Sequence, residues 1–413
     1  MANAPALLST ERAERIAALA KAGVDLKQGR VTTTSNPLWK ALKAVGSELW
    51  LDTGDLDAAT PLYSSEFTAL TTNNTLLNKE VQKGIYDALI TNVSKELKDL
   101  DQQTKVIEIA FILNAHHGLR LVQKFGGKVS VELHTDLAND AERSLHYARR
   151  YYAICPTNFI VKLPLTPAGL IATRQLAAEG IPVNFTLGFS ARHNHLSAAF
   201  AKPAYVNVFL GRLNAYVSDN KLGDGKMVGE KAMLASQRTV TAVSHGKTKH
   251  IAASLRGASQ VADLAGIDVY TMPTTVAEAS VKELKAPFTN QVKNDPAVQW
   301  APGVDAKQIR ASTIWDIDPK LDAAAKDLDK KPPKDAADLV KRLAAAGVGD
   351  LFPAFTAADI SAIAKDGKIP KHATWAARIA SGELAIDTML NYAALYSFIA
   401  DQQQMDDRIR KYL

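Results

Sequence analysis

Eight short apolar runs, separated by longer helical stretches, constrain the fold of this 413-residue chain more than any other feature. The runs begin at residues 48, 69, 128, 159, 182, 205, 249 and 267. Between them lie amphipathic segments such as "TPAGLIATRQLAAEG", which ends at Gly180 just before a proline, as helices commonly do. Strands that alternate with helices indicate parallel βαβ units. Eight such units predict an α/β fold, a closed (β/α)8 TIM barrel.

The flanking segments predict helices on either side of this barrel. Residues 1–45 form an N-terminal helical segment in our interpretation, with Ser9 or Thr10 as its helix cap. The barrel takes residues 46–285. Residues 286–413 are predicted to be a helical extension that packs on the barrel, so that the chain is a single barrel domain. A separate small domain is the alternative for this last segment.

Composition excludes several classes of protein. With 47% hydrophobic and 22% charged residues the chain has the composition of a globular protein. The net charge of +6 comes from Lys and Arg spread along the sequence, which fits anionic small metabolites and does not favour nucleic acid. The single cysteine, Cys155, excludes an internal disulfide. With no signal-peptide pattern and no run of about 18 apolar residues, we expect a cytoplasmic protein without a membrane segment.

Polar side chains alternate with apolar ones in five of the predicted strands, for example Lys162 between Val161 and Leu163. Strands of a parallel sheet normally read as continuous apolar runs, because both faces are covered. In a barrel the second face is the interior, and catalytic groups sit at the carboxyl ends of the strands. The side chains that we assign to the interior are Ser130, Glu132, His134, Lys162, Asn184, Thr186, Asn207, Phe209, His250, Ser254 and Arg256. So many polar groups would make a costly core, which favours an active site.

The strand that begins at residue 249 follows the same alternation. It places Ile251, Ala253 and Leu255 against the outer helices and His250, Ser254 and Arg256 inside. An antiparallel sheet with one solvated face would show the same alternation. The long helical separators count against that alternative, because hairpins need only about two to five residues.

Lys162 is the side chain with the clearest chemistry. Burial without a partner disfavours a charged ammonium and produces the neutral amine, which is a nucleophile that forms a Schiff base with a carbonyl. Carboxylates on neighbouring strands, Asp52 and Glu132, could relay the protons that this chemistry needs. The alternative is an edge-strand lysine that reaches solvent.

Seven stretches, in chain order, resemble transaldolase, and together they cover about residues 48–285. They are "WLDTGD", "TTNNT", "VSVEL", "VKLPLTPAGL", "GIPVNFTLGFS", "VFLGRL" and "AASLR". The final helix from "ELAIDTML" also resembles the C-terminal helix of the family. The resemblance implies a barrel enzyme of the pentose phosphate pathway that moves a dihydroxyacetone unit from a ketose phosphate to an aldose phosphate. We expect no cofactor, and sugar phosphates as its small-molecule partners.

The resemblance also implies catalytic roles for four residues. Lys162 matches the Schiff-base lysine, and Asp52 matches the aspartate that takes the hydroxyl proton during carbon–carbon cleavage. Glu132 and Thr186 match the pair that holds a proton-shuttling water.

Substrate contacts follow from the same resemblance. Asn73 and Asn184 match residues that bind the donor's hydroxyl groups. Arg212, Ser254 and Arg256 match the phosphate site, where a guanidinium offers bidentate geometry.

Three positions bear on substrate preference. Phe209 matches a position where transaldolases keep phenylalanine and fructose-6-phosphate aldolases tend to have tyrosine, so transfer is favoured over simple cleavage. Asn207 stands where the family has a substrate-binding serine. Asn74 stands where the family usually has proline, which relaxes the backbone there.

Alternatives remain open at the level of function. A class I aldolase of the fructose-6-phosphate type, or a pathway-specific transaldolase with another ketose donor, would use the same lysine. An inactive barrel that binds sugar phosphates would not use it. A homodimer is one arrangement that the sequence leaves open.

Two groups of neighbouring histidines, His116 with His117 and His193 with His195, have no carboxylate or cysteine at a recognised ligand spacing. We therefore expect solvent-exposed histidines and no metal site.

Overall fold

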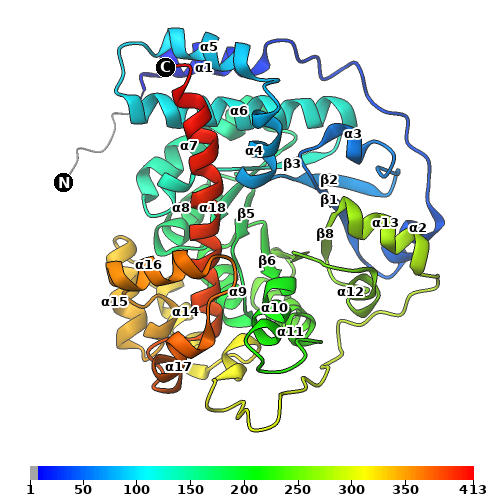
Figure 1. Cartoon of the computed structure of the whole chain (residues 1–413), viewed down its shortest axis with the longest axis vertical. Helices are drawn as coiled ribbons and strands as arrows, with labels where there is room; N and C mark the ends of the chain where they lie inside the picture. The colour runs from blue at the N-terminus through cyan, green and yellow to red at the C-terminus, as the bar shows by residue number, and fades with distance from the viewer. Residues whose placement is uncertain (1–7) are drawn as a thin grey trace.

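A computed structural model describes residues 8–413, and its centre is a closed barrel of eight parallel strands that are hydrogen-bonded in sequence order (Figure 1). The strands are β1 Glu48–Asp52, β2 Phe67–Thr71, β3 Lys128–Glu132, β4 Phe159–Pro164, β5 Val183–Thr186, β6 Tyr205–Phe209, β7 Lys249–Ala253 and β8 Val269–Pro273. Each overlaps one of the eight runs in the sequence. The predicted (β/α)8 barrel is confirmed.

Helices precede, separate and follow the strands. The helices from the N-terminus to the one that follows β8 are α1 Thr10–Lys21, α2 Pro37–Ala44, α3 Leu56–Ala59, α4 Asn74–Gln82, α5 Asp87–Glu96, α6 Gln102–Phe125, α7 Ala141–Ile154, α8 Pro167–Ala178, α9 Ala191–Leu196, α10 Leu210–Asp219, α11 Val228–Ser244, α12 Ala258–Asp263 and α13 Thr274–Glu283. The extension holds α14 Pro319–Lys330, α15 Ala336–Ala345, α16 Ala357–Asp366, α17 His372–Ala380 and α18 Ile386–Arg410.

Local sequence signals explain where several of these helices begin and end. The Ser9 side chain accepts a hydrogen bond from the Arg12 amide, so Ser9 is the predicted cap of α1. Thr166 caps α8 in the same way, with Pro167 in the first helical position, where a missing N–H costs nothing. Helix α6 ends at Phe125, and the next residue, Gly126, has a φ of +72° that suits glycine.

The barrel interior has an apolar layer beneath a polar one. The apolar layer consists of Trp50, Ala69, Ile160, Tyr205, Ile251 and Val269. Because side chains alternate along a strand, the residues two positions further on also face inward. These include Asp52, Thr71, Lys162, Asn207 and Thr271, which are polar and lie toward the carboxyl ends of the strands. The lower layer therefore closes the barrel under a polar chamber.

Strand β7 corrects the sequence-based assignment of its faces. Ile251 packs inside the barrel, whereas His250 points outward and its Nε2 lies 2.6 Å from the Ser236 hydroxyl of α11. The reason lies after the strand, where Ser254 adopts a φ of +64° and interrupts the alternation. Ser254 and Arg256 consequently reach the chamber although His250 does not.

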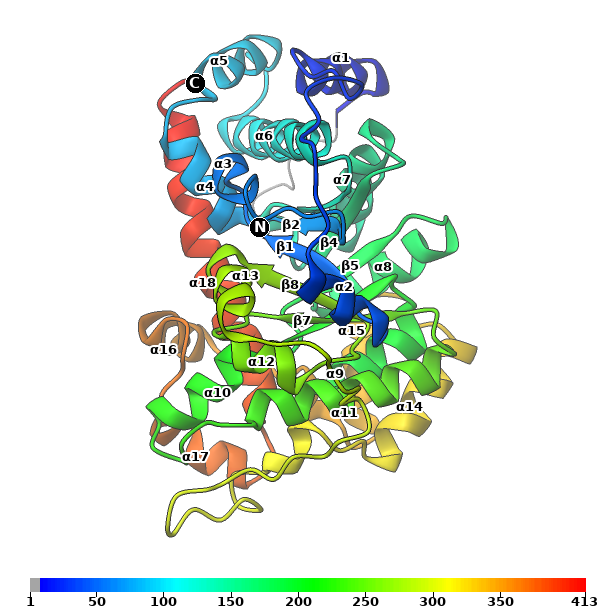
Figure 2. The ribbon, with the colours of Figure 1, turned by 90° about the vertical axis from the view of Figure 1, so that its right-hand side faces the viewer.

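The extension packs against the barrel, and its last helix crosses the carboxyl ends of the strands (Figures 1 and 2). The Asn391 amide of α18 donates to the Leu165 carbonyl at 3.1 Å and to the Leu187 carbonyl at 2.8 Å, just beyond β4 and β5. Near the other end of α18, Arg408 pairs with Asp87 of α5 at 2.8 Å. Helix α18 is thus tied to the mouth of the barrel and to its flank.

A buried ionic cluster fixes the start of α18. Arg192 of α9 donates to both carboxylate oxygens of Asp387, at 2.7 and 2.8 Å, and to Asp350 at 2.8 Å. Arg310 also pairs with Asp350, at 2.9 Å. Arg192 holds the pKa of the Asp387 carboxyl well below its ordinary value, against the opposing effect of burial.

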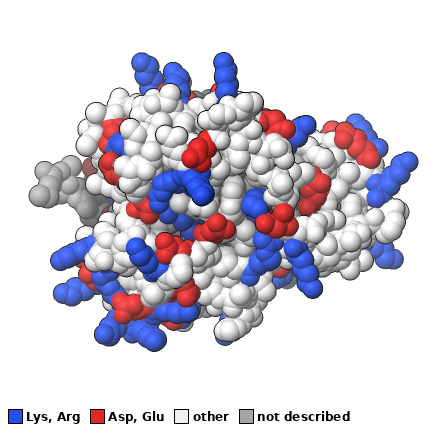
Figure 3. Space-filling model, turned by 90° about the horizontal axis from the view of Figure 1, so that it is seen from below, with Lys and Arg blue, Asp and Glu red and all other residues white. Residues whose placement is uncertain are grey.

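The surface carries both signs of charge. On the face shown in Figure 3, basic side chains are interspersed with acidic ones. Within residues 8–413, the helices are all too short or too polar to cross a bilayer.

Candidate active site

Lys162 points into the polar chamber and faces Glu132 on the neighbouring strand. Its side-chain nitrogen lies 3.8 Å from Glu132 Oε2 and donates to the Thr72 carbonyl at 3.3 Å. The pairing of β3 with β4 sets Glu132 directly opposite Lys162, which explains the approach. Lys162 is 5% exposed and Glu132 3%, so the alternative of a solvent-reaching lysine is wrong.

The Glu132 carboxylate is held by a backbone amide as well as by the lysine. Burial raises the pKa of Glu132, while the charge of Lys162 and the Asn74 N–H favour its ionised form. That N–H donates to Glu132 Oε2 at 3.1 Å, and the Asn74 side chain donates to the Leu133 carbonyl, also at 3.1 Å. Proline has no N–H, so the family's usual residue at this position could not make the first bond.

Asp52 is a second buried carboxyl beside Lys162. Burial raises its pKa, and the charge of Lys162 and a hydrogen bond from Thr71 act in the opposite direction. The Thr71 hydroxyl donates to Asp52 Oδ1 at 2.7 Å and lies 2.6 Å from the Thr271 hydroxyl. Two carboxyls with raised pKa values therefore flank one amine, an arrangement typical of acid–base sites.

A cavity of about 190 Å³ opens above these groups. Every predicted site residue except Glu132 and Thr186 lines it: Asp52, Asn73, Lys162, Asn184, Asn207, Phe209, Arg212, Ser254 and Arg256. Glu132 lies just behind Lys162. Thr186 is fully buried, and its hydroxyl has no hydrogen-bond partner in residues 8–413.

The wall of the cavity nearest α10 is cationic. Burial lowers the pKa of Arg212 to about 10, and the charge of Arg256 acts in the same direction. Arg212 is 7% exposed, and its Nη1 lacks a hydrogen-bond partner among the described residues. Two guanidinium groups that repel one another, one with a donor that is unpaired within residues 8–413, have the geometry and charge that suit an anion.

Three asparagines line the cavity, but they differ in what their amides contact. Asn73 caps α4 through its side-chain oxygen, at 2.9 Å from the Leu76 amide. Asn184 donates to Ser130 at 3.1 Å, and its oxygen is unpaired within the described chain. Asn207 accepts from Gly188 N–H at 3.1 Å and donates to the Phe185 carbonyl at 2.6 Å. The two polar atoms of the Asn207 amide thus bind β5 and the segment that follows it.

Sequence reasoning missed two cavity residues of the extension, Phe398 and Lys368. The Phe398 ring of α18 lies over the site, with its centroid 5.9 Å from Lys162 Nζ and 5.8 Å from Arg212 Cζ. Cations are attracted to aromatic faces at such distances. Nothing in the local pattern around either residue distinguishes it from neighbouring surface positions.

The expectation of solvent-exposed histidines is wrong. His117, His193 and His195 are all buried, and His195 lies 3.2 Å from Asp322 of α14, which covers α9. Burial lowers the pKa of His117 to about 3 and that of His193 to about 4. In the part of the chain that the structure describes, no His, Cys, Asp and Glu group is arranged to hold a metal ion.

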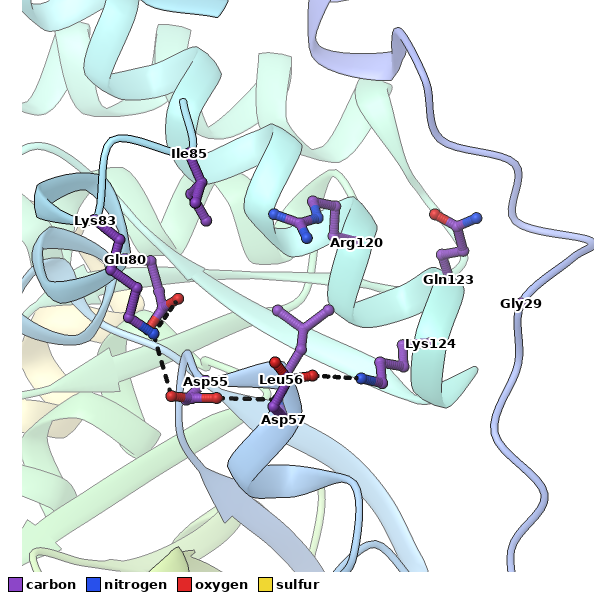
Figure 4. Close-up of a pocket in the computed structure, with 10 residues that line it drawn as sticks. All are labelled: Gly29, Asp55, Leu56, Asp57, Glu80, Lys83, Ile85, Arg120, Gln123 and Lys124. Carbon is purple, nitrogen blue, oxygen red and sulfur yellow. Dashed lines mark hydrogen bonds and ion pairs between the residues drawn. The ribbon is translucent and has the colours of Figure 1, made fainter. Parts of the chain in front are cut away.

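A second hollow, of about 390 Å³, lies between α3, α4 and α6 and contains no predicted site residue (Figure 4). Its lysines are paired within the hollow, Lys83 with Glu80 at 2.8 Å and Lys124 with Asp57 at 3.1 Å. The carboxylates of this hollow therefore neutralise its lysines, unlike the arginines above Lys162.

The sequence of this chain is similar to those of several transaldolases. A probable transaldolase of Thermus thermophilus is 35% identical over 247 residues, which are 59% of this chain and 93% of the relative. A transaldolase of Xanthomonas euvesicatoria is 31% identical over 240 residues, 55% of this chain and 73% of the relative. A probable transaldolase of Lactiplantibacillus plantarum is 35% identical over 211 residues, 50% and 84% of the two chains. The model of the transaldolase/fructose-6-phosphate aldolase family matches residues 49–341, and the chain belongs to this family.

Proposed function

We propose that the protein is a transaldolase that transfers a dihydroxyacetone unit from a ketose phosphate to an aldose phosphate through a Schiff base on Lys162. The observation that carries the proposal is the convergence of one amine, two buried carboxyls and two guanidinium groups at one chamber. Lys162 Nζ lies 3.8 Å from Glu132, and the cavity above it is lined by Asp52, Arg212 and Arg256. The names of the relatives favour the same reaction.

The first half of the proposed reaction forms the imine. The Lys162 amine attacks the keto carbon, and the resulting carbinolamine loses water. Each step moves a proton, and Glu132 is the carboxyl within reach of the nitrogen. Because burial raises its pKa, Glu132 can both accept and donate protons nearer to neutral pH than an ordinary glutamate. The unpaired Thr186 hydroxyl is suited to hold a water for this transfer.

The second half breaks and remakes a carbon–carbon bond. Asp52 accepts the proton of the donor's hydroxyl as the bond cleaves, the electron pair moves to the protonated imine, and an aldose phosphate leaves. The enamine that remains attacks the aldehyde of the acceptor, and water then releases the new ketose from Lys162. Arg212 and Arg256 would hold the phosphate, which fixes the position of the reacting carbons.

Borohydride trapping tests the proposal. With a ketose phosphate, reduction is expected to attach the three-carbon unit to one peptide, which contains Lys162, as mass spectrometry would show. Lys162→Ala is expected to lose both the adduct and activity, while Lys365→Ala, on exposed α16, keeps both. Absence of an adduct in the parent chain, with sugar phosphate still bound, would instead identify an inactive binding barrel.

A second measurement separates transfer from simple cleavage. The rate of glyceraldehyde 3-phosphate formation from fructose 6-phosphate is compared with and without an aldose phosphate acceptor. A transaldolase needs the acceptor to turn over. Equal rates in both conditions would make the protein an aldolase of the fructose-6-phosphate type.

A further inference from the structure

We propose that Lys368, in the loop between α16 and α17, is a third phosphate-binding cation of the active-site cavity and is supplied by the helical extension. The inference rests on the proposed function for the identity of the ligand, a sugar phosphate. It assigns a binding role to a segment that lies beyond residue 341, where the match to the family ends. Lys368 lines the same cavity as Lys162, Arg212 and Arg256.

The loop that carries Lys368 is fastened to the helix that carries Arg212. Asn220, at the end of α10, donates to the Pro370 carbonyl at 3.0 Å and accepts from the His372 amide at 2.8 Å. The Tyr216 hydroxyl of α10 lies 2.7 Å from His372 Nδ1. These three contacts hold Pro370 and His372, which lie two and four residues after Lys368. The loop is therefore anchored to the helix that carries Arg212, whereas the Lys368 side chain itself is exposed.

The charge of Lys368 is not neutralised by the protein. Within residues 8–413 no carboxylate forms an ion pair with it, whereas Lys371 in the same loop lies 3.9 Å from Asp366. Arg212 Nη1 likewise lacks a hydrogen-bond partner among the described residues, although the charge of Asp401 acts on this guanidinium and Asp52 interacts with Arg256. Lys368 and the two arginines line one cavity, and an anion that binds between cations relieves their mutual repulsion.

The chemistry of the three cations suits a phosphate dianion. A guanidinium offers planar, bidentate hydrogen bonds, and the buried Arg212 supplies that geometry. An ammonium on a flexible stem acts as a point charge, which suits the exposed Lys368. We therefore infer that the arginines orient the phosphate, whereas Lys368 adds attraction that depends on salt.

The test measures binding of inorganic phosphate to the full chain by calorimetry at low and high salt. Lys368→Gln is expected to weaken binding about threefold to fivefold at low salt, the upper range for exposed ion pairs, and to reduce the salt dependence. Lys368→Arg keeps the charge and restores the affinity. Lys365→Gln, a matched loss of charge on α16 outside the cavity, is expected to bind phosphate as the parent does.

Steady-state kinetics give a second readout. Lys368→Gln is expected to raise KM for fructose 6-phosphate while leaving that for unphosphorylated fructose unchanged, since only the phosphate contact is lost. Equal phosphate affinity and salt dependence in parent and Lys368→Gln would overturn the inference, as would an equal loss in Lys365→Gln. Phosphate binding does not require the imine, so failure of Lys162 trapping would refute the proposed function and leave this inference standing.

Discussion

Replacing Asn74 by proline removes a single N–H from the Glu132 carboxylate, and this change tests how that carboxylate is controlled. Asn74 is the first residue of α4, a position where proline is well tolerated. Proline also requires an extended residue before it, and Asn73 has φ −155° and ψ 171°. The helix is therefore expected to form, and the lost N–H bond is isolated by comparing this variant with Asn74→Ala, since both lose the asparagine side chain.

The size of the effect follows from the bond that is lost. The Asn74 N–H lies 3.1 Å from Glu132 Oε2, an ordinary hydrogen bond to a charged acceptor, and such bonds contribute about 1.5–3 kcal/mol. At the lower end, the ratio of ionised to protonated Glu132 falls about tenfold at a given pH. Burial already raises the pKa of Glu132, and loss of a donor to the carboxylate raises it further.

The assay is kcat/KM for the donor against pH. Asn74→Pro is expected to move the acidic limb of the profile to higher pH, with activity recovered on the alkaline side of that limb. Asn74→Ala is the matched control: it keeps the N–H and loses only the side-chain bonds, to the Leu133 carbonyl and from the Asn114 amide. Its acidic limb should coincide with that of the parent. A profile for Asn74→Pro that matches Asn74→Ala would refute the reasoning, provided both variants unfold at similar urea concentrations.

Two further predictions concern stability. Arg192→Met leaves Asp387 buried without its partner and is expected to lower the free energy of unfolding in urea by about 3–5 kcal/mol. Arg149→Met breaks an exposed ion pair and is expected to lower it by less than about 1 kcal/mol. Equal losses in the two variants would contradict this prediction. Burial holds the pKa of His117 and of His250 at about 3, below the value of about 6.5 in the unfolded chain, so each stays neutral in the fold. The free energy of unfolding should therefore fall as the pH drops below about 6.5, by up to about 1.4 kcal/mol per pH unit for each histidine. Equal free energies of unfolding at pH 7 and pH 5 would exclude the effect.

The inward face of most strands could be predicted because the period of a strand is two residues. In β3 and β4, apolar side chains such as Val131 and Val161 alternate with Glu132 and Lys162, and the structure places them as the pattern predicts. Strand β7 could not be predicted in this way. Its interior residues are the apolar Ile251 and Ala253, so polarity no longer marks the inward face.

The contributions of the extension could not be predicted from periodicity at all. Phe398 and Lys368 reach the cavity because α18 and the loop before α17 dock on the barrel, and that docking depends on distant partners. Arg192 and Asp387, for example, are 195 residues apart in sequence. No local pattern links such positions, and a charged residue before a helix normally indicates solvent exposure. Only the tertiary contacts show that these side chains face the chamber.

The apolar layer of the barrel and the docked helix α18 both affect how far the active-site carboxyls are exposed to water. The apolar layer that contains Trp50 and Ile160 closes the chamber from below, and Phe398 lies above Lys162. Asp52 and Phe398 line the same cavity, and Glu132 lies 3.8 Å from Lys162 beside it. Since burial is the largest cause of the raised pKa of both Asp52 and Glu132, docking of α18 helps to set the proton affinity of these groups. The helical extension thus helps to enclose the groups to which the proposed function assigns proton transfer.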